Sequence, residues 1–183
     1  VEGCFEVPIR QPDIRWDYAT SGGSLMDLGC YPMSWVRHVT GEEPEVVEAE
    51  AEVGPPHIDA AIRAELRFPS GATGSVTSAM TRGPKLDLVV VGSEGRLEAT
   101  NPMAPQNGNL LTITTAAGTT SGPIEAGISY DHMVRAFVDH LVHGAPFPTS
   151  GADSIANMAA IDAVYQAAGL PIRGLDAPES AAS

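Results

Sequence analysis

A carboxylate and a phenol lie four residues apart in the segment GGSLMDLGCY at residues 22–31. On a helix, residues four apart share a face, so the side chains of Asp27 and Tyr31 would lie close together. A carboxylate can orient a neighbouring phenol, and a phenol in an apolar cleft can protonate a developing alkoxide or deprotonate an alcohol. On spacing alone the commoner alternative stays open: Asp27 is an ordinary first-turn acid of a helix and Tyr31 is a core aromatic residue.

The other residue types capable of chemistry carry weaker signals. His140 and His143 could share a helix face, but no third ligand follows at a suitable spacing, so no metal site is predicted. Cys4 and Cys30 form no CxxC pair, which argues against both a disulfide framework and a zinc site. His140 and His143 are therefore interpreted as solvated surface residues.

The composition indicates a folded chain and excludes several classes of protein. The chain has 183 residues, of which 43% are hydrophobic and 18% are charged, values that exclude intrinsic disorder and a bundle of membrane helices. Its 23 acidic and 10 basic residues give a net charge of −13, with Lys85 as the single lysine. Nucleic-acid binding needs clustered cations, so it is not expected, and neither is a membrane partner. Nothing resembles a signal peptide, which favours a cytoplasmic location.

The acid–phenol segment opens the first predicted helix, at about residues 24–40. Ser24 is the expected N-cap, Gly41 the stop, and Pro32 predicts a kink or break near Cys30. Further helices are expected at residues 130–142, where Met133, Phe137 and Leu141 form one stripe, and at about 153–168.

Between the first and second helices the pattern changes to alternation and β-branched residues. Strands are predicted at residues 46–53, 60–68, 72–80, 86–91, 96–100 and 110–115. Short turns separate most of them, which favours antiparallel neighbours, and GSEG at residues 92–95 reads as a hairpin turn rather than a nucleophile elbow. The chain also begins in strand-like sequence. The predicted fold class is α+β: an open, mostly antiparallel sheet with helices packed on one face.

The segment SGGSLMDLGCY at residues 21–31 resembles the GGGxLxDxGxY/H motif of the Gfo/Idh/MocA oxidoreductase family. Further similar segments follow in the family's order: DIRWD at 13–17, TGEEP at 40–44, FPSGA at 68–72 and VGSEG at 91–95. The resemblance extends from residue 1 to about 174. It implies a dihydrodipicolinate-reductase-like C-terminal domain that binds substrate and oligomerises, followed by a frayed tail at residues 175–183.

The resemblance also implies roles for particular residues. Asp27 and Tyr31 fall on the family's catalytic positions, and a tyrosine there is similar to the glucose–fructose oxidoreductase, dihydrodiol dehydrogenase and xylose dehydrogenase branch. In that branch the tyrosine exchanges a proton with the substrate hydroxyl. Arg15 and Trp16 are candidates to line the sugar-facing end of the cleft, and the alternative, a solvated arginine beside an apolar anchor, stays open. Tyr130 begins a helix that in relatives passes near the active site, so it is a further candidate for substrate binding.

The family's cofactor half has no counterpart in this sequence. Family members begin with a Rossmann domain that carries a GxGxxG-like loop and then a Glu-Lys-Pro segment with a catalytic lysine, and neither pattern occurs here. NAD or NADP is therefore expected in an N-terminal domain absent from this chain, and its contact residues are unknown. The chain reads as a piece of something longer, inactive by itself.

Two hypotheses from different classes can be drawn. The first is a substrate-binding domain of an NAD(P)-dependent enzyme acting on the CH–OH group of a sugar or polyol. It would form a homo-oligomer, at least a dimer, through the open sheet face, with apolar area from Val76, Val89 and Val91. The alternative is a non-catalytic truncated paralogue that serves as a sheet-mediated interaction module. An upstream in-frame segment encoding GxGxxG and Glu-Lys-Pro would favour the first.

Overall fold

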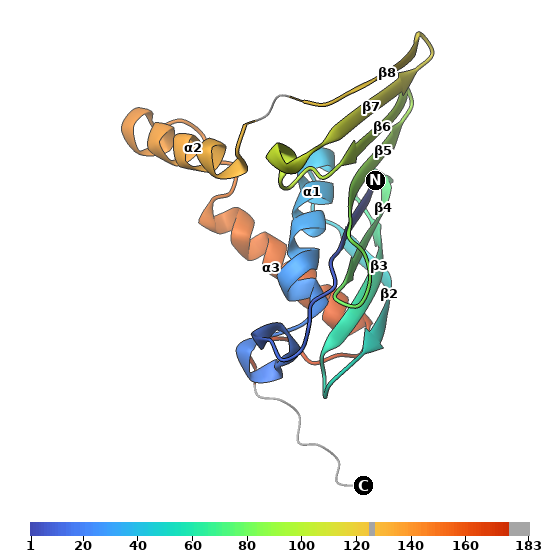
Figure 1. Cartoon of the computed structure of the whole chain (residues 1–183), viewed down its shortest axis with the longest axis vertical. Coiled ribbons are helices and arrows are strands. Elements are labelled where there is room, and N and C mark those ends of the chain that lie inside the picture. The colour runs from blue at the N-terminus through green and yellow to red at the C-terminus, as the bar shows by residue number, and fades with distance from the viewer. Residues whose placement is uncertain (125–126, 176–183) are drawn as a thin grey trace, which may run out of the picture.

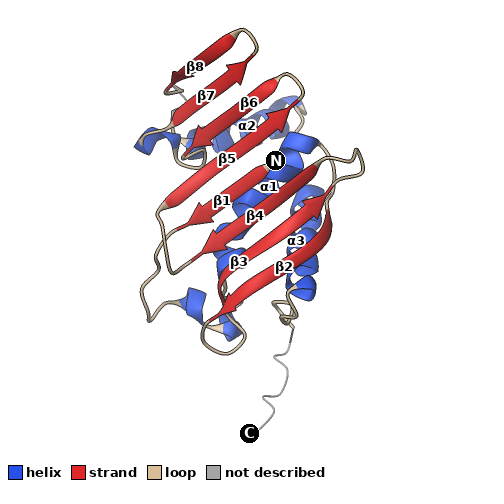
Figure 2. Ribbon diagram, turned by 90° about the vertical axis from the view of Figure 1, so that its right-hand side faces the viewer, coloured by secondary structure: helices blue, strands red, loops and turns tan. Residues whose placement is uncertain are grey.

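A computed structural model describes residues 1–124 and 127–175, in which eight strands form one sheet with helices on one face (Figures 1 and 2). The order across the sheet is β2-β3-β4-β1-β5-β6-β7-β8, and all neighbours are antiparallel except the parallel pair β1 and β4. The strands are β1 (Glu2–Glu6), β2 (Glu45–Val53), β3 (Asp59–Arg67), β4 (Thr73–Ala79), β5 (Lys85–Gly92), β6 (Gly95–Thr100), β7 (Leu110–Thr115) and β8 (Gly118–Gly122). The predicted fold class is confirmed.

The six predicted strands all form, and β1 continues the strand-like start of the chain. The eighth strand, β8, was not predicted. Its sequence, GTTSG, contains no large apolar residue, so neither alternation nor composition marks it as a strand. It forms because it pairs with β7 in a tight hairpin, in which Thr112 and Ser121 hydroxyls lie 2.8 Å apart. The predicted tail lies outside the described residues, except for Leu175.

Two helices, α1 (Cys30–Thr40) and α3 (Gly151–Ala167), cover one face of the sheet and form the core with it (Figure 1). Alternate residues of β3 and β4 point toward these helices because side chains on a strand alternate between the two faces. Ile62, Leu66 and Val76 belong to this core. The placement of Val76 on the open face was therefore wrong: it is 1% exposed and faces the helices.

The open face of the sheet is polar. Arg82 donates to Glu52 and Glu6, and Arg96 pairs with Glu98 across this surface. Val91 is exposed, but charged and hydroxyl side chains surround it along the strands. Association through this face would therefore rest on polar contacts more than on an apolar patch.

The kink or break predicted near Cys30 is not a break: residues Leu25–Gly29 form one π-helical turn that continues directly into α1 at Cys30, with helical backbone at Gly29 and Cys30. The prediction of Ser24 as N-cap was wrong, because its backbone is already helical and its hydroxyl donates to Asp59 Oδ2 at 2.9 Å. A buried carboxylate from β3 therefore holds the start of this turn in place of a local cap.

Helix α2 (Ser129–His143) forms as predicted but stands away from the sheet (Figure 1). None of its residues is buried, and Met133, Phe137 and Leu141 are 52%, 49% and 66% exposed. A wide apolar face on a helix of this length normally packs against something. The stripe predicted from the sequence therefore exists and stays largely exposed, although the Phe147 ring packs against Phe137 with ring centres 6.0 Å apart.

Candidate active site

Two short turns position the first candidate residues. Asp13 accepts a hydrogen bond from the Arg15 amide (2.9 Å) at the start of the 3-10 turn Ile14–Trp16. Asp17 caps the next turn, Tyr18–Thr20, in the same way through the Ala19 amide (3.0 Å). The two acids of the DIRWD segment are thus turn-forming caps, which fold the segment back toward the π-helical turn.

Two glycines allow the DIRWD segment to lie directly against the start of the π-helical turn. The amides of Gly22 and Gly23 donate to the carbonyls of Asp17 and Arg15, each at 2.9 Å. A Cβ on Gly22 would lie 2.5 Å from the Arg15 carbonyl oxygen, so no larger residue fits there. The DIRWD segment and the segment at residues 21–31, two of those that carry the resemblance, are therefore hydrogen-bonded to one another.

Arg15, Asp27 and Tyr31 line one cleft of about 310 Å³ on the helix-covered side of the sheet. Arg15 Nε lies 2.7 Å from Asp27 Oδ2, and Arg15 Nη1 lies 3.2 Å from Asp13 Oδ1. The guanidinium thus forms an ion pair with one acid of each segment, Asp13 and Asp27, although its buried Nε makes no hydrogen bond within the described residues. The remaining walls of the cleft are apolar: Phe5, Val7, Ile9, Leu28 and Met103.

The Tyr31 phenol is available to a ligand. Its ring centre lies 5.7 Å from that of Phe5, and its side chain is partly exposed. Within residues 1–124 and 127–175, its hydroxyl has no hydrogen-bond partner. Burial raises the pKa of Tyr31, the neighbouring Asp27 carboxylate raises it further, and the Arg15 cation opposes them. The phenol is therefore protonated at neutral pH and can donate a proton in the cleft.

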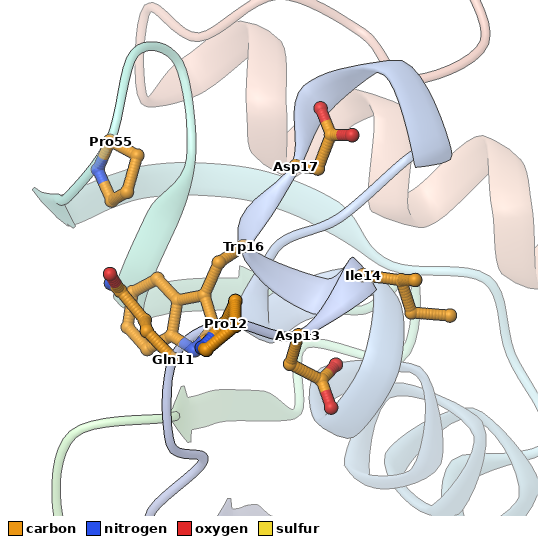
Figure 3. Close-up of a pocket in the computed structure, with 7 residues that line it drawn as sticks. All are labelled: Gln11, Pro12, Asp13, Ile14, Trp16, Asp17 and Pro55. Carbon is orange, nitrogen blue, oxygen red and sulfur yellow. The ribbon is translucent and has the colours of Figure 1, made fainter.

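Trp16 does not line this cleft. Its indole Nε1 donates to the Ile9 carbonyl at 3.1 Å, and its ring packs on the smaller of the two core clusters. It borders a separate, open hollow of about 770 Å³, where Asp13, Ile14 and Asp17 point away from the indole rather than toward a common centre (Figure 3). Since a binding site needs convergent polar groups, we assign no site to this hollow despite its size.

Tyr130 lies at the start of α2 and is 72% exposed. The hydroxyl of the preceding residue, Ser129, donates to the carbonyl of Met103, which lines the cleft, at 2.7 Å. Tyr130 itself does not line the cleft. Of the five residues singled out in the sequence, the structure thus brings together Arg15, Asp27 and Tyr31, with Tyr130 at the periphery and Trp16 apart.

The described part of the chain offers no cradle for a dinucleotide's phosphates. Such a cradle needs a glycine-rich turn from a strand into a helix. Gly71 instead lies in the turn between β3 and β4, and Lys85 begins β5 opposite Glu6. Across residues 1–124 and 127–175, no three His, Cys, Asp or Glu side chains gather as metal ligands, and no helix is long and apolar enough to cross a membrane.

Three buried residues beside the π-helical turn were not found from the sequence. Asp59, Tyr165 and Arg173 are 0%, 0% and 6% exposed, and they form one hydrogen-bonded cluster. They lie far apart in the chain and in no motif, so no local signal marks them.

The fold and the cleft together define an α+β domain that presents an acid–phenol pair on the helix-covered side of an open sheet. The chain belongs to the GFO/IDH/MocA family: the model of that family's C-terminal domain matches residues 1–98.

Several relatives are similar over most of the chain. D-xylose 1-dehydrogenase (NADP(+)) 2 of Haloferax volcanii is 30% identical over 90% of this chain and 51% of its own length. The pig (Sus scrofa) trans-1,2-dihydrobenzene-1,2-diol dehydrogenase is 31% identical over 56% of this chain and 31% of its own length. The solved aldose-aldose oxidoreductase of Caulobacter crescentus, in complex with glycerol, superimposes with a TM-score of 0.83 at 25% identity, over 92% of this chain and 52% of its own. The chain thus spans about half the length of the relatives that it matches most completely.

Proposed function

We propose that residues 1–174 are the substrate-binding domain of an NAD(P)-dependent oxidoreductase that acts on the CH–OH group of a sugar or polyol. The nucleotide would bind to an N-terminal Rossmann domain outside this chain, since the described residues do not fit its phosphates. The observation that carries the proposal is the Tyr31 hydroxyl, which has no partner in the described residues and opens on the cleft that holds the Arg15–Asp27 ion pair. The xylose dehydrogenase and aldose oxidoreductase relatives support a sugar substrate.

The chain's own residues would handle the proton of the reaction. Oxidation of a CH–OH group removes a hydride, which a bound nicotinamide accepts by its own chemistry, and a proton from the oxygen. In the direction of reduction, the protonated Tyr31 phenol donates that proton to the developing alkoxide. In the direction of oxidation, the phenol must first lose its proton to solvent through the open cleft, and the Arg15 cation favours this loss because it partly offsets the rise that burial gives to the pKa of Tyr31. Asp27, paired with Arg15, would accept a hydrogen bond from a second substrate hydroxyl.

We further propose that the exposed apolar face of α2 contacts the nucleotide-binding domain. The helix carries seven exposed large apolar residues: Tyr130, Met133, Val134, Phe137, Val138, Leu141 and Val142. The Ser129 hydroxyl at its N-terminus donates to the carbonyl of Met103, a wall of the cleft, at 2.7 Å, so a domain seated on α2 would also adjoin the reacting groups. The relatives are about twice as long as this chain, which makes such a domain the favoured occupant over a second copy.

Changing this face should separate the two domains of a two-domain protein. That protein is this chain preceded by a nucleotide-binding domain, either one encoded upstream or the N-terminal half of the Haloferax volcanii relative fused to it. We expect Leu141→Glu to lower its turnover at least tenfold, because a buried unpaired charge disrupts a domain contact. His143→Glu, on the same helix, is the matched control. Equal activity of the two variants, measured by steady-state kinetics, would contradict the proposed contact.

The 183-residue chain alone should not bind the nucleotide appreciably. Without a glycine loop at a helix N-terminus, the pyrophosphate lacks the backbone donors on which dinucleotide affinity depends. Fluorescence titration with NADH and with NADPH is the measurement. Saturable micromolar binding of either nucleotide by the pure chain would contradict the assignment of nucleotide binding to another domain.

Steady-state kinetics of the two-domain protein tests the whole proposal. We expect NAD(P)H to form with at least one compound in a panel of aldoses and polyols, and little with simple primary alcohols. A two-domain protein that binds the nucleotide but oxidises nothing in the panel, and does not reduce the matching ketoses or lactones, would contradict it.

The rival function is a non-catalytic module that associates through its sheet. The polar character of the open face disfavours an apolar sheet-to-sheet contact, although charge-paired homo-oligomers through that face remain part of our proposal. A cytoplasmic location, where nicotinamide nucleotides are abundant, also belongs to it.

A further inference from the structure

We infer that Asp59 and Arg173 are positioning residues for the active-site turn: a buried ion pair that fixes the backbone carrying Arg15 and Asp27. The catalytic consequence rests on the function proposed above, whereas the structural link stands on the contacts alone. We call this pair, with Tyr165, the buried clamp.

Asp59 is the centre of the clamp. Its side chain is fully buried, and each carboxylate oxygen accepts two hydrogen bonds. Oδ2 accepts from the Leu25 amide at 2.7 Å and the Ser24 hydroxyl at 2.9 Å, and both of these donors lie at the start of the π-helical turn. Oδ1 accepts from the Tyr165 hydroxyl at 3.0 Å and from Arg173 Nη2 at 2.8 Å. A residue of β3 thus joins the turn to α3 and to the segment that follows α3.

Arg173 uses all three of its nitrogens. Nε donates to the Gly22 carbonyl at 2.7 Å, Nη2 to the His57 carbonyl at 2.8 Å, and Nη1 to the Pro171 carbonyl at 2.7 Å. Its guanidinium carbon lies 4.2 Å from the ring centre of Tyr165 and 5.0 Å from that of Tyr18. A planar guanidinium between two rings, with its donors matched to fixed carbonyls, holds one geometry and no other.

The clamp reaches the active site through the two glycines. Gly22, held by Arg173, donates to the Asp17 carbonyl, and the next amide, that of Gly23, donates to the Arg15 carbonyl. On the other side, the Leu25 amide bound to Asp59 begins the turn that carries Asp27. Both partners of the 2.7 Å Arg15–Asp27 ion pair are therefore linked to the clamp through the backbone: Arg15 through its hydrogen bond with Gly23, and Asp27 two residues after Leu25.

The chemistry of the clamp argues for geometry rather than for stability alone. Taking a carboxylate and a guanidinium out of water is expensive, and a well-packed apolar pair is often as stable. Burial raises the pKa of Asp59, and its four donors oppose that rise. What the ion pair supplies that apolar residues could not is a set of directed hydrogen bonds to the turn's backbone.

A second buried arginine provides a matched control. Arg37 is 5% exposed and donates to Glu43, Asp153 and Asn157, which joins α1 to α3 without a contact to the π-helical turn. Arg173→Met and Arg37→Met each remove a buried guanidinium from its acidic partners. Both should lower the melting temperature, so any difference between them isolates the effect on the turn.

Hydrogen exchange on the 183-residue chain tests the link without reference to function. In Arg173→Met we expect the amides of residues 22–29 to exchange roughly tenfold faster or more, because their local opening becomes easier. In Arg37→Met, compared at the same margin below its melting temperature, these amides should exchange as in the wild type. Equal exchange at residues 22–29 in the two variants would overturn the clamp. If Arg173→Met does not fold, Arg173→Lys, which keeps the charge but loses the planar fork, should show the same contrast.

Kinetics of the two-domain protein then tests the catalytic consequence. Arg173→Met should lower kcat by about tenfold or more with a smaller change in KM, since misplacement of reacting groups costs rate. Arg37→Met should leave kcat near wild type. Faster exchange with an unchanged kcat would overturn the positioning role while leaving the clamp intact. A wild-type two-domain protein without activity on sugars would instead refute the proposed function. The hydrogen-exchange result would still test the clamp, because it does not depend on activity.

Discussion

Replacement of Tyr31 by phenylalanine lowers the turnover number of the two-domain protein on the order of 10² to 10⁴, the range that general acid–base catalysis contributes. The variant keeps the ring and its contact with Phe5 and loses only the hydroxyl. Because that hydroxyl has no hydrogen-bond partner in the described residues, its removal breaks no hydrogen bond there. Stability should therefore hardly change. Affinity for the nucleotide should also stay the same, because its contacts are assigned to the other domain.

A second tyrosine serves as control. The Tyr18 hydroxyl donates to the Ile172 carbonyl at 2.8 Å, outside the cleft, so Tyr18→Phe should lower stability rather than turnover. Asp27→Asn should be milder than Tyr31→Phe if the carboxylate only orients the substrate. The decisive comparison is kcat at saturating sugar and nucleotide. A kcat of Tyr31→Phe within a few-fold of wild type would show that the phenol takes no part in the mechanism. The similarity to the family would then be one of fold alone.

Replacement of Gly23 by alanine destabilises the chain by about 3 kcal/mol or more, since it combines backbone strain with disruption of a buried ion pair. Gly23 has a φ of +133°, a conformation that residues with a Cβ rarely adopt. The new methyl group would overlap Asp59 Oδ1 and would lie 2.9 Å from the Tyr165 hydroxyl. Because Asp59 is fully buried and holds four donors, it cannot move aside without breaking them.

Gly92→Ala is the matched control for this change. Gly92 ends β5, a Cβ there would meet no atom within 4 Å, and its φ lies outside the left-handed range. Urea denaturation of the 183-residue chain gives both free energies of unfolding. A Gly23→Ala variant as stable as Gly92→Ala would show that the backbone at Gly23 is not held as the structure places it.

Much of the fold could be predicted because every strand except β8 carries its own signal in the sequence. Alternation along β3 separates the buried Ile62 and Leu66 from the exposed Arg63, and the turn residues between strands require short connections. The predictions that failed concern features that depend on the neighbouring elements in space. Val76 resembles any other strand valine, and only the register with β1 and β3 decides which face it joins. Helix α2 was recognisable from its stripe, but a sequence does not show what covers it.

The candidate site divides in the same way. The spacing of Asp27 and Tyr31 along one helical stretch was readable, whereas Arg15 joins them only through the fold of the DIRWD turns. Its neighbour Trp16 points elsewhere, because successive residues of a tight turn face different directions. Asp59 and Arg173 are 114 residues apart and are ordinary surface types in composition, so their pairing could emerge only from the assembled structure.

The central claim is that this chain presents a sugar hydroxyl carbon for oxidation, and direct transfer of hydrogen tests it most sharply. The two-domain protein is incubated with oxidised nicotinamide nucleotide and an aldose deuterated at every carbon, and the nucleotide is then examined by mass spectrometry and NMR. We predict that one deuteron appears on the nicotinamide ring and that Tyr31→Phe slows its arrival without changing where it goes. A nucleotide that stays unlabelled while bound to a folded two-domain protein, across the aldoses and polyols of the panel, would contradict the claim.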